Sequence, residues 1–362
     1  MKNNHNNYPH SVYSDFLSSG KLLEYLSSRF KPGTELHVIC DSNTAKLCFP
    51  ILKKHINEVY FLNFVAFYEG EKHKNLKTCQ TIWSYLSEFG IRKDSLIINL
   101  GGGITSDIGG FCASIYLRGI PFINIPTSLM AMVDGSLGGK TGVDLDNLKN
   151  ILGVINFPEA VFIDAEFLKT LPRREFHSGY NEMIKHGLIA DAEYFVHLTD
   201  NAFENRISEA IRKSVEIKMN IISEDPFDKG LRRTLNFGHT IGHAIETAFL
   251  RFSDKSVLHG EAILLGMIAE SYLSELHGIL SKNDLDLIIE KLKQRLLKVN
   301  FDKNVIDEIL QYIMYDKKHS SSQMNFTLLE APGKAVVNQN VNKKDIRSSL
   351  EYVAWLTESN TK

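Results

Sequence analysis

The chain has 362 residues, of which 43% are hydrophobic and 23% are charged, as is typical of a globular protein with room for two domains. Its formal net charge of −2 gives no reason to expect nucleic acid or an anionic membrane surface as a partner. No apolar run approaches the roughly 18 residues of a membrane span, and residues 1–10 lack the apolar core of a signal sequence. The four cysteines show no CxxC spacing, which predicts free thiols in a reduced, cytoplasmic setting.

The first half of the chain alternates short apolar runs with stretches of helical periodicity. Residues 44–56 and 76–90 carry apolar side chains at the spacing of a helix. Strands that alternate with helices predict a parallel sheet with helices on both faces. The ligand crevice of such a sheet lies beyond the carboxyl ends of the strands, where Asp41, Gly101 to Asp107 and Thr127 to Ser128 fall. The predicted strands are residues 35–40, 58–64, 95–103, 121–128 and 160–164.

After residue 172 the pattern becomes mainly helical, and seven of the nine prolines lie at or before that position. Residues 324–337 predict the only hairpin of this half. We expect an α/β domain over residues 1–170 and a mainly helical domain over residues 171–362, packed closely around a shared cleft. The predicted helices cover residues 176–190, 205–222, 238–250, 260–277 and 284–297.

The segment LGGGITSDIGGF (100–111) places three glycines between a strand and a helix. Backbone amides at such a junction can hold a phosphate, because glycine permits close approach and the helix N-terminus carries partial positive charge. The segment is not GxGxxG, and glycine triplets are common at tight turns. Nucleotide binding and a plain structural turn therefore both stay open at this point.

Two further segments are rich in charged residues. YEGEKHKN (68–75) is most simply a solvated loop, although its position after a strand would let it reach the crevice. VDGSLGGKTGVDLDNLKN (133–150) has little apolar content, and its glycines separate charged and polar side chains. We interpret this second segment as a loop that meets a phosphorylated substrate, with a plain surface connection as the alternative.

Residues that suit a metal lie in the second half. His239 and His243 are four apart on one predicted helix, as in HExxH sites, but the glutamate of that motif is missing. His259 opens the next helix and supplies a third imidazole. Glu182, which shares a helix face with Lys185, is a candidate carboxylate. Three protein ligands with an open position are typical of a catalytic zinc, whereas each histidine alone is more often a core or surface residue.

The order of motifs along the chain resembles that of the sugar phosphate cyclases, and most closely the 3-dehydroquinate synthase family. The resemblance runs from about residue 35 to residue 340. It is carried by LGGGITSD, RGIPFINIPTSLMAMVDGSLGGKTGV, KNILG, FLKTLP, SGYNEMIKHG, GLRRTLNFGHTIGHAIE and HGEA.

The resemblance implies a Rossmann-like N-terminal domain that binds NAD, a helical C-terminal domain that holds one divalent metal (zinc, with cobalt possible), and a homodimer. It implies Glu182, His239 and His259 as the metal ligands. The implied NAD contacts are Asp41, Asn43, Glu71, Lys74, Gly102, Gly103, Ile104, Thr105, Ser106, Asp107, Thr127, Ser128, Asp134, Lys140, Lys149, Phe167, Leu168, Lys169 and Thr170. The implied contacts to a sugar phosphate substrate are Lys140, Asn150, Lys185, Lys218, Arg232, Asn236, His243, Lys317 or Lys318, and Arg118 reaching across the dimer.

The reaction that the resemblance implies converts 3-deoxy-D-arabino-heptulosonate 7-phosphate into 3-dehydroquinate and phosphate, within the shikimate pathway of aromatic amino acid biosynthesis. It proceeds by transient oxidation by NAD, phosphate elimination, re-reduction and intramolecular aldol closure. The chain departs from the family pattern at Ser106 (glycine), Ser128 (threonine), Asn181 (alanine) and Asp228 (glutamate). We expect Asn181, which precedes a predicted ligand, to alter the surroundings of the metal.

Three alternatives remain at this point. The nearest is a sibling cyclase that makes an aminodehydroquinate, a deoxy-inosose or a valiolone; the lysine in GGKTGV and both histidines in GHTIGHAIE disfavour the last two. A metal-dependent alcohol or glycerol dehydrogenase shares the expected architecture, but a small neutral alcohol needs no cluster of cations. An inactive NAD- or metal-binding module is disfavoured because every expected cation is present.

Overall fold

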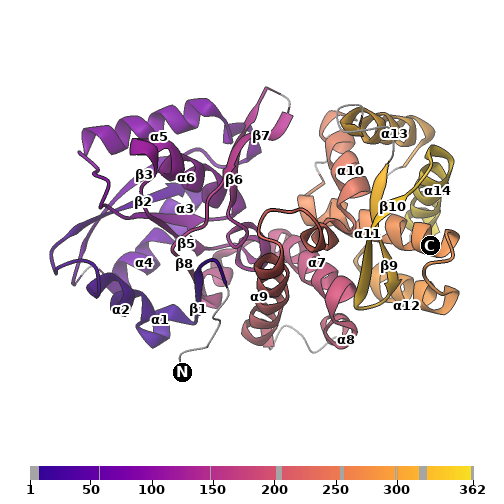
Figure 1. The fold of residues 1–362 in the computed structure, drawn as a ribbon, viewed down its shortest axis with the longest axis horizontal. Helices are drawn as coiled ribbons and strands as arrows, with labels where there is room; N and C mark the ends of the chain where they lie inside the picture. Colours follow the sequence, from indigo (N-terminus) through magenta and orange to yellow (C-terminus); the bar gives the residue numbers. More distant parts are fainter. Residues whose placement is uncertain are drawn as a thin grey trace. The chain divides into compact units, whose positions relative to one another are not determined.

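A computed structural model describes residues 8–56, 58–146, 148–200, 206–252, 257–297, 299, 301–317 and 324–359. The chain forms two compact units, Met1–Phe176 and His177–Lys362, which appear in Figure 1 in indigo to magenta and in red to yellow. Each unit is described by itself. Within the described residues, no helix combines the length and the apolar character that crossing a membrane requires.

A six-stranded parallel sheet forms the centre of the first unit. The five predicted strands are confirmed, although β3 begins three residues later than predicted, and β1 was not predicted. Three central strands, β4, β5 and β8, are buried along their whole length, as is expected when helices cover both faces. The order across the sheet is β1 (Ser11–Ser14), β8 (Ala160–Ile163), β5 (Phe122–Pro126), β4 (Ile97–Gly101), β2 (Glu35–Asp41) and β3 (Phe61–Phe67).

The order of the strands reverses at one point. The chain runs from β2 to β3 on one side of β2, and then returns to β4 on the other side. In doubly wound sheets, ligands bind at such a reversal, outside the carboxyl ends of the two strands. Asp41 ends β2 and Gly101 ends β4, so both residues lie at this point.

Helices α5 (Leu76–Glu88) and α6 (Gly103–Ile115) pack together on the sheet (Figure 1). Cys79, Ile82 and Leu86 of α5 recur at helical spacing, so one face of the helix is apolar and buried. That face joins the buried side chains of α6, β2, β4 and β5 in one core. The other helices of this unit are α1 (Phe16–Ser19), α2 (Lys21–Ser27), α3 (Ser42–Leu47) and α4 (Phe49–Ile56).

The prediction of an irregular loop over residues 133–150 is wrong. Residues Ala131–Gly135 form a π-helical turn, and residues 140–155 contain an antiparallel hairpin of β6 (Lys140–Leu145) and β7 (Leu148–Ile155). Gly142 and Gly153 face each other in this hairpin, and a Cβ on Gly142 would lie 2.6 Å from the carbonyl oxygen of Leu152. The glycines that suggested a loop therefore allow the two strands to approach closely.

The second unit is mainly helical, as predicted, and residues 324–337 form the predicted hairpin, now bounded as β9 (Asn325–Ala331) and β10 (Lys334–Asn340). Three of its helices, α8, α13 and α14, were not predicted. The helices are α7 (Arg173–Ala190), α8 (Ala192–Thr199), α9 (Ile207–Glu224), α10 (His239–Phe252), α11 (His259–Leu276), α12 (Lys282–Leu292), α13 (Lys303–Lys317) and α14 (Lys343–Ser359).

Helices α10 and α11 touch through their backbones near their N-terminal ends. A Cβ on Gly266 of α11 would lie 1.9 Å from the carbonyl oxygen of Gly238 and 2.8 Å from the nitrogen of Gly242. A Cβ on Gly242 would in turn lie 3.0 Å from the carbonyl oxygen of Ala262. Only glycine permits this approach, which holds the first turns of the two helices side by side.

Candidate cofactor and metal sites

The N-terminus of α6 adjoins the point where the strand order reverses. Its N-cap residue is Gly102, which has no side chain to accept the amide hydrogens of the first turn. A Cβ on Gly103 would meet no atom within 4 Å, so open space adjoins these amides. An amide-lined helix end beside open space fits a bound diphosphate. Ser106, which departs from the family pattern, donates to the Gly102 carbonyl at 3.3 Å and so bonds within its own helix.

Asp41 connects the ends of β2 and β4. One oxygen of its carboxylate accepts from the backbone amides of Asn43 and Thr44, both at 2.9 Å, and thereby caps α3. The other oxygen accepts from the hydroxyl of Thr105 at 3.2 Å. The amide of Thr127, after β5, donates to the Gly101 carbonyl at 2.9 Å. These bonds bring four predicted cofactor residues to one edge of the sheet.

A second network of predicted residues is centred on Lys74. The ammonium lies 2.6 Å from the carboxylate of Asp107 on α6 and donates to the side-chain carbonyl of Asn150 on β7. Lys149 lies 3.6 Å from Glu71 in an adjacent ion pair. Lys74 itself is only 4% exposed. Burial raises the pKa of Asp107 to about 6, and the charge of Lys74 opposes this rise only in part.

The remaining predicted residues of the first unit occupy four places. Ser128 follows β5, and its hydroxyl accepts from the amide of Ala131 at 3.3 Å. Asp134 lies in the π-helical turn, and Lys140 is exposed at the start of β6. Residues Phe167, Leu168, Lys169 and Thr170 belong to a 3₁₀ helix, Ala165–Thr170. Arg118 is exposed in a short turn and has a left-handed backbone, with φ of 62°.

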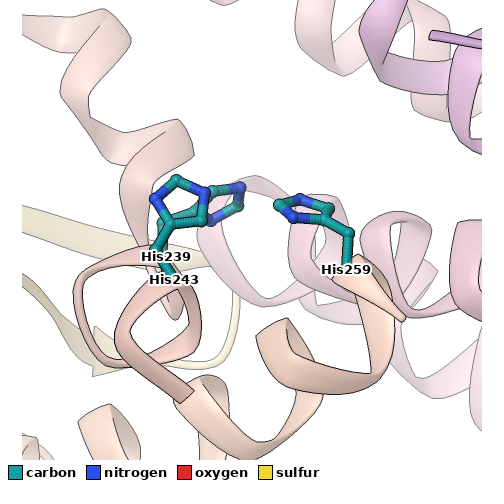
Figure 2. A group of neighbouring side chains, drawn as sticks. All are labelled: His239, His243 and His259. Atoms are coloured by element: carbon teal, nitrogen blue, oxygen red, sulfur yellow. The ribbon is translucent and has the colours of Figure 1, made fainter. Parts of the chain in front are cut away.

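Three imidazoles converge in the second unit. His239 and His243 project from the first turns of α10, and His259 projects from the first residue of α11 (Figure 2). One ring nitrogen from each of the three lies within 4.8 Å of the others. The ring centroids are 5.1 to 5.5 Å apart. This is a geometry in which one cation can be shared.

The outer nitrogens of two of these rings are turned towards oxygen acceptors. The Nδ1 atom of His239 lies 3.1 Å from the carbonyl oxygen of Phe237, and that of His259 lies 3.2 Å from the carboxylate of Glu246. Because these oxygens accept, Nδ1 is the donor in both bonds, which leaves Nε2 as the nitrogen available to a cation when the ring is neutral. Burial, the Lys185 ammonium and the two neighbouring imidazoles hold the pKa of His239 well below its ordinary value. Imidazoles oriented in this way fit a divalent metal.

Glu182, on α7, has a fully buried carboxylate, but it is not among the three side chains whose ligand atoms converge. One of its oxygens accepts from Lys185, whose ammonium also donates to the carbonyl of Leu235 at 2.8 Å. The other oxygen, Oε2, is buried and has no hydrogen-bond partner among the residues that the structure describes. A buried carboxylate oxygen is costly to leave unsatisfied, so a cation at this position would fit it.

Asn181, like Ser106 a departure from the family pattern, connects α7 with α11. Its side-chain amide donates to the carbonyl of Gly260 at 3.1 Å, and the amide of Gly260 donates to the hydroxyl of Ser178 at 3.0 Å. Asn181 precedes Glu182, and Gly260 follows His259. The asparagine therefore ties together the backbones beside two predicted metal ligands.

Three predicted cations of the second unit are buried. Lys185 is 1% exposed, Lys218 on α9 is 5% exposed, and Arg232 is 4% exposed in the 3₁₀ helix Leu231–Asn236. Asn236 ends that helix and is exposed. Lys317 ends α13, and its side chain is not described. Lys318 lies outside the described residues.

Two carboxylates that support these residues were missed in the sequence. Asp225 accepts from the backbone amides of Lys229, Gly230 and Arg232 at 2.6 to 3.1 Å, so it fixes the turn that presents Arg232. Glu246 orients His259. The spacing of Glu246 from His239 and His243 is i+7 and i+3, which places all three on one helix face and could have identified it.

Two family models match the chain in succession: 3-dehydroquinate synthase N-terminal over residues 64–178 and 3-dehydroquinate synthase C-terminal over residues 179–319. The chain belongs to the 3-dehydroquinate synthase family. It is 38% identical to 3-dehydroquinate synthase of Parabacteroides distasonis, with 94% of each chain covered. It is also 38% identical to that of Clostridium acetobutylicum, with 94% of this chain and 97% of the relative covered.

Solved structures share this fold. A 2-epi-5-epi-valiolone synthase from Streptomyces hygroscopicus, solved with NAD⁺ and Zn²⁺ bound, has a TM-score of 0.84 and 25% identity, with 96% of this chain and 97% of that chain covered. A probable glycerol dehydrogenase from Sinorhizobium meliloti has a TM-score of 0.60 at 15% identity, with coverage of 97% and 98%. The expected fold, a Rossmann-like domain followed by a helical domain, is thus confirmed for this family member.

Proposed function

We propose that this chain is a lyase that converts 3-deoxy-D-arabino-heptulosonate 7-phosphate into 3-dehydroquinate and phosphate with the help of NAD and one divalent metal. The observation that carries the proposal is the convergence of His239, His243 and His259 in a chain that matches the family along both units. The glycerol dehydrogenase neighbour shares the fold at far lower identity. Its function is therefore the weaker candidate.

The NAD site of this proposal lies at the N-terminus of α6. The amides that follow Gly102 would bind the diphosphate, and the edge of the sheet at Asp41 would take a ribose. When bound, NAD supplies a reversible hydride acceptor and the metal supplies a Lewis acid. The buried Lys74 would hold the neighbouring loop and hairpin in place through Asp107 and Asn150.

The metal ligands of this proposal are Glu182, His239 and His259. His239 and His259 have their Nδ1 atoms held by protein oxygens, as ligating histidines usually do, and Glu182 has a buried oxygen to offer. His243 is the most exposed of the three imidazoles, so it would face the substrate as a polar partner. Three protein ligands would leave a position open for the substrate.

Buried and exposed cations would bind the anionic groups of the substrate. Lys185, Lys218 and Arg232 are almost fully buried, and a positive charge attracts an anion more strongly in such surroundings than in water. Preorganised cations of this kind stabilise the charge that develops on a departing phosphate. Lys140 and Asn150, both exposed on the β6–β7 hairpin, would add contacts to the substrate.

The test is release of inorganic phosphate from the heptulosonate phosphate by the purified chain. We expect release to need both NAD and a metal, to stop when a chelator is added, and to resume with Zn²⁺ or Co²⁺, with no net NADH. Stoichiometric NADH from glycerol would favour a dehydrogenase. Turnover of the amino analogue or of glucose 6-phosphate in place of the heptulosonate would favour a sibling cyclase.

We further propose a homodimer in which Arg118 reaches the neighbouring site. Strand β7 is an edge strand of the two-stranded β6–β7 sheet and exposes apolar side chains, with Leu148 at 52% and Ile151 at 56%. Exposed apolar strands of this kind commonly mark an interface. Ile151→Glu should shift the sedimentation coefficient from dimer to monomer. If the wild-type chain sediments as a monomer, this part of the proposal is wrong.

We also propose a cytoplasmic location. The four cysteines are free and buried. Burial raises the pKa of the Cys40 thiol to about 12, so this thiol stays protonated and unreactive. Free thiols persist in reducing compartments, and localisation of a tagged chain would test this.

A further inference from the structure

A buried carboxyl group lies behind the histidine cluster and belongs to none of the motifs in the sequence. Glu270 is on α11, about three turns beyond His259, and its side chain is 0% exposed. The neighbouring residues Ser271 and Ser274 are also 0% exposed. A carboxyl group in such surroundings is costly unless its oxygens are satisfied.

Both oxygens of Glu270 bind the start of α10. Oε2 accepts from the amide of Gly238 at 2.6 Å, and Oε1 accepts from the amide of Ile241 at 3.1 Å. These two amides lie on either side of His239. A carboxyl group that accepts two amides through two different oxygens fixes both the position and the rotation of the helical turn between them.

The backbone at this point also packs closely against α11 through glycines. Gly238 has a φ of 78°, a left-handed conformation that turns the chain from the preceding 3₁₀ helix into α10. Gly238 and Gly242 lie against the side chains of Met267 and Ile263 on α11, and Gly266 lies against the backbone of Gly238. The two hydrogen bonds from Glu270 add a directional constraint to this non-directional packing.

We propose that Glu270 is a positioning residue of the metal site. It holds the first turns of α10 from α11, and so sets His239 and His243 at the correct distance from His259. This inference rests on the proposed metal-binding function of the cluster. Glu270 is assigned no ligand role, because among the described residues it is not one of the side chains whose ligand atoms converge on the imidazole group.

The consequence is a metal affinity that depends on a residue without contact to the metal. Metal sites require ligand distances within about 0.2 Å of their ideal values, and partners that orient the ligands typically contribute 10- to 100-fold in affinity. We expect Glu270→Gln, which keeps the shape but only one accepting oxygen, to weaken Co²⁺ binding about 10-fold. Glu270→Ala, which removes both oxygens, should weaken it about 100-fold.

The experiment measures Co²⁺ affinity of the full-length metal-free chain by competition with a chromophoric chelator, and records the visible absorption of bound Co²⁺. Urea unfolding of each variant is measured in parallel. Leu350→Ala is the matched control, because Leu350 is fully buried on α14 of the same unit and its truncation destabilises the fold without removing a hydrogen bond at α10. His259→Ala is the reference for loss of a ligand.

The outcomes separate this inference from the proposed function. If wild-type chain binds Co²⁺ and Glu270→Gln binds it within twofold as tightly, with the same spectrum, Glu270 has no positioning role and the metal site still stands. If Leu350→Ala loses as much affinity as Glu270→Gln, the effect is general destabilisation and the inference is wrong. If wild-type chain and His259→Ala bind Co²⁺ equally, the proposed metal site itself fails. Because Glu270→Gln conserves volume, the test holds even where Glu270→Ala does not fold.

Discussion

Replacing Lys74 by methionine removes an ammonium that lies 2.6 Å from the Asp107 carboxylate, while it keeps most of the apolar stem of the side chain. Asp107 has a raised pKa of about 6 even beside Lys74, because burial disfavours its charged form. Against an ordinary value of 3.8, that difference corresponds to about 3 kcal/mol for keeping the carboxylate ionised in the folded state. Without the Lys74 ammonium, the free energy needed to ionise Asp107 in the folded state is larger still.

The sign of the pH dependence follows from proton binding. A carboxyl with a raised pKa binds more protons folded than unfolded between its two pKa values, so stability falls as the pH rises through that window. In the wild-type chain, the fall in stability that Asp107 causes as the pH rises ends near pH 6. In Lys74→Met the folded pKa is higher, so the fall extends to neutral pH and beyond. We expect the variant to lose about 3 kcal/mol more stability at pH 8 than at pH 5.

The assay is urea unfolding between pH 5 and pH 8, followed by tryptophan fluorescence in a Trp355→Phe background. Trp83 is then the only tryptophan, and it reports on the first unit, where its indole donates to the Cys112 carbonyl at 3.2 Å. The double variant Lys74→Met/Asp107→Asn should lose the added pH dependence. Parallel profiles for the wild-type chain and Lys74→Met between pH 6 and pH 8 would refute the reasoning.

Three further predictions concern the second unit. Gly266→Ala places a methyl group 1.9 Å from the Gly238 carbonyl, so the two helices must separate; we expect a loss of about 2–3 kcal/mol in urea unfolding, and an unchanged midpoint would contradict the close contact. Asp225→Ala removes the acceptor of three backbone amides in the turn that presents Arg232. KM for the sugar phosphate should therefore rise about 10-fold or more, while NAD affinity measured by fluorescence stays constant. A change in NAD affinity alone would point to another role for Asp225. Glu246→Gln weakens the acceptor that orients the His259 imidazole and should lower Co²⁺ affinity about 10-fold. Equal Co²⁺ affinity of the variant and the wild-type chain in chelator competition would contradict this prediction.

The sequence predicts those parts of the fold that depend on local pattern. The central strands are continuous apolar runs bounded by turn residues, which is why β2, β4 and β5 were found close to their true positions. Strand β1 has only four residues, Ser11–Ser14, and no apolar run, so its place in the sheet depends on pairing with a strand far along the chain. The β6–β7 hairpin was missed because its glycines imitate a loop.

Some residues of the candidate sites can likewise be found from local spacing, whereas others require the coordinates. His239 and His243 are found from their spacing, because i and i+4 share a helix face in any helix. The bonds from Lys74 to Asp107 and to Asn150 join residues 33 and 76 positions apart, and no periodicity encodes them. Such contacts follow from strand order and loop path, which are properties of the assembled sheet. Asn181 was singled out by its departure from the family pattern, but its bond to Gly260 required the coordinates.

The three imidazoles come from a stretch of sequence that begins at His239 and ends at His259, on two helices joined by glycine contacts. Contacts of short sequence separation form early in folding, because little chain entropy is lost in closing them. The edge of the sheet beside the N-terminus of α6, in contrast, needs strands from across the whole first unit. The pair of helices α10 and α11 can therefore bring its three histidines together while the sheet is still incomplete. The sequence separation of the residues in each site thus predicts that the histidine cluster forms before the edge of the sheet.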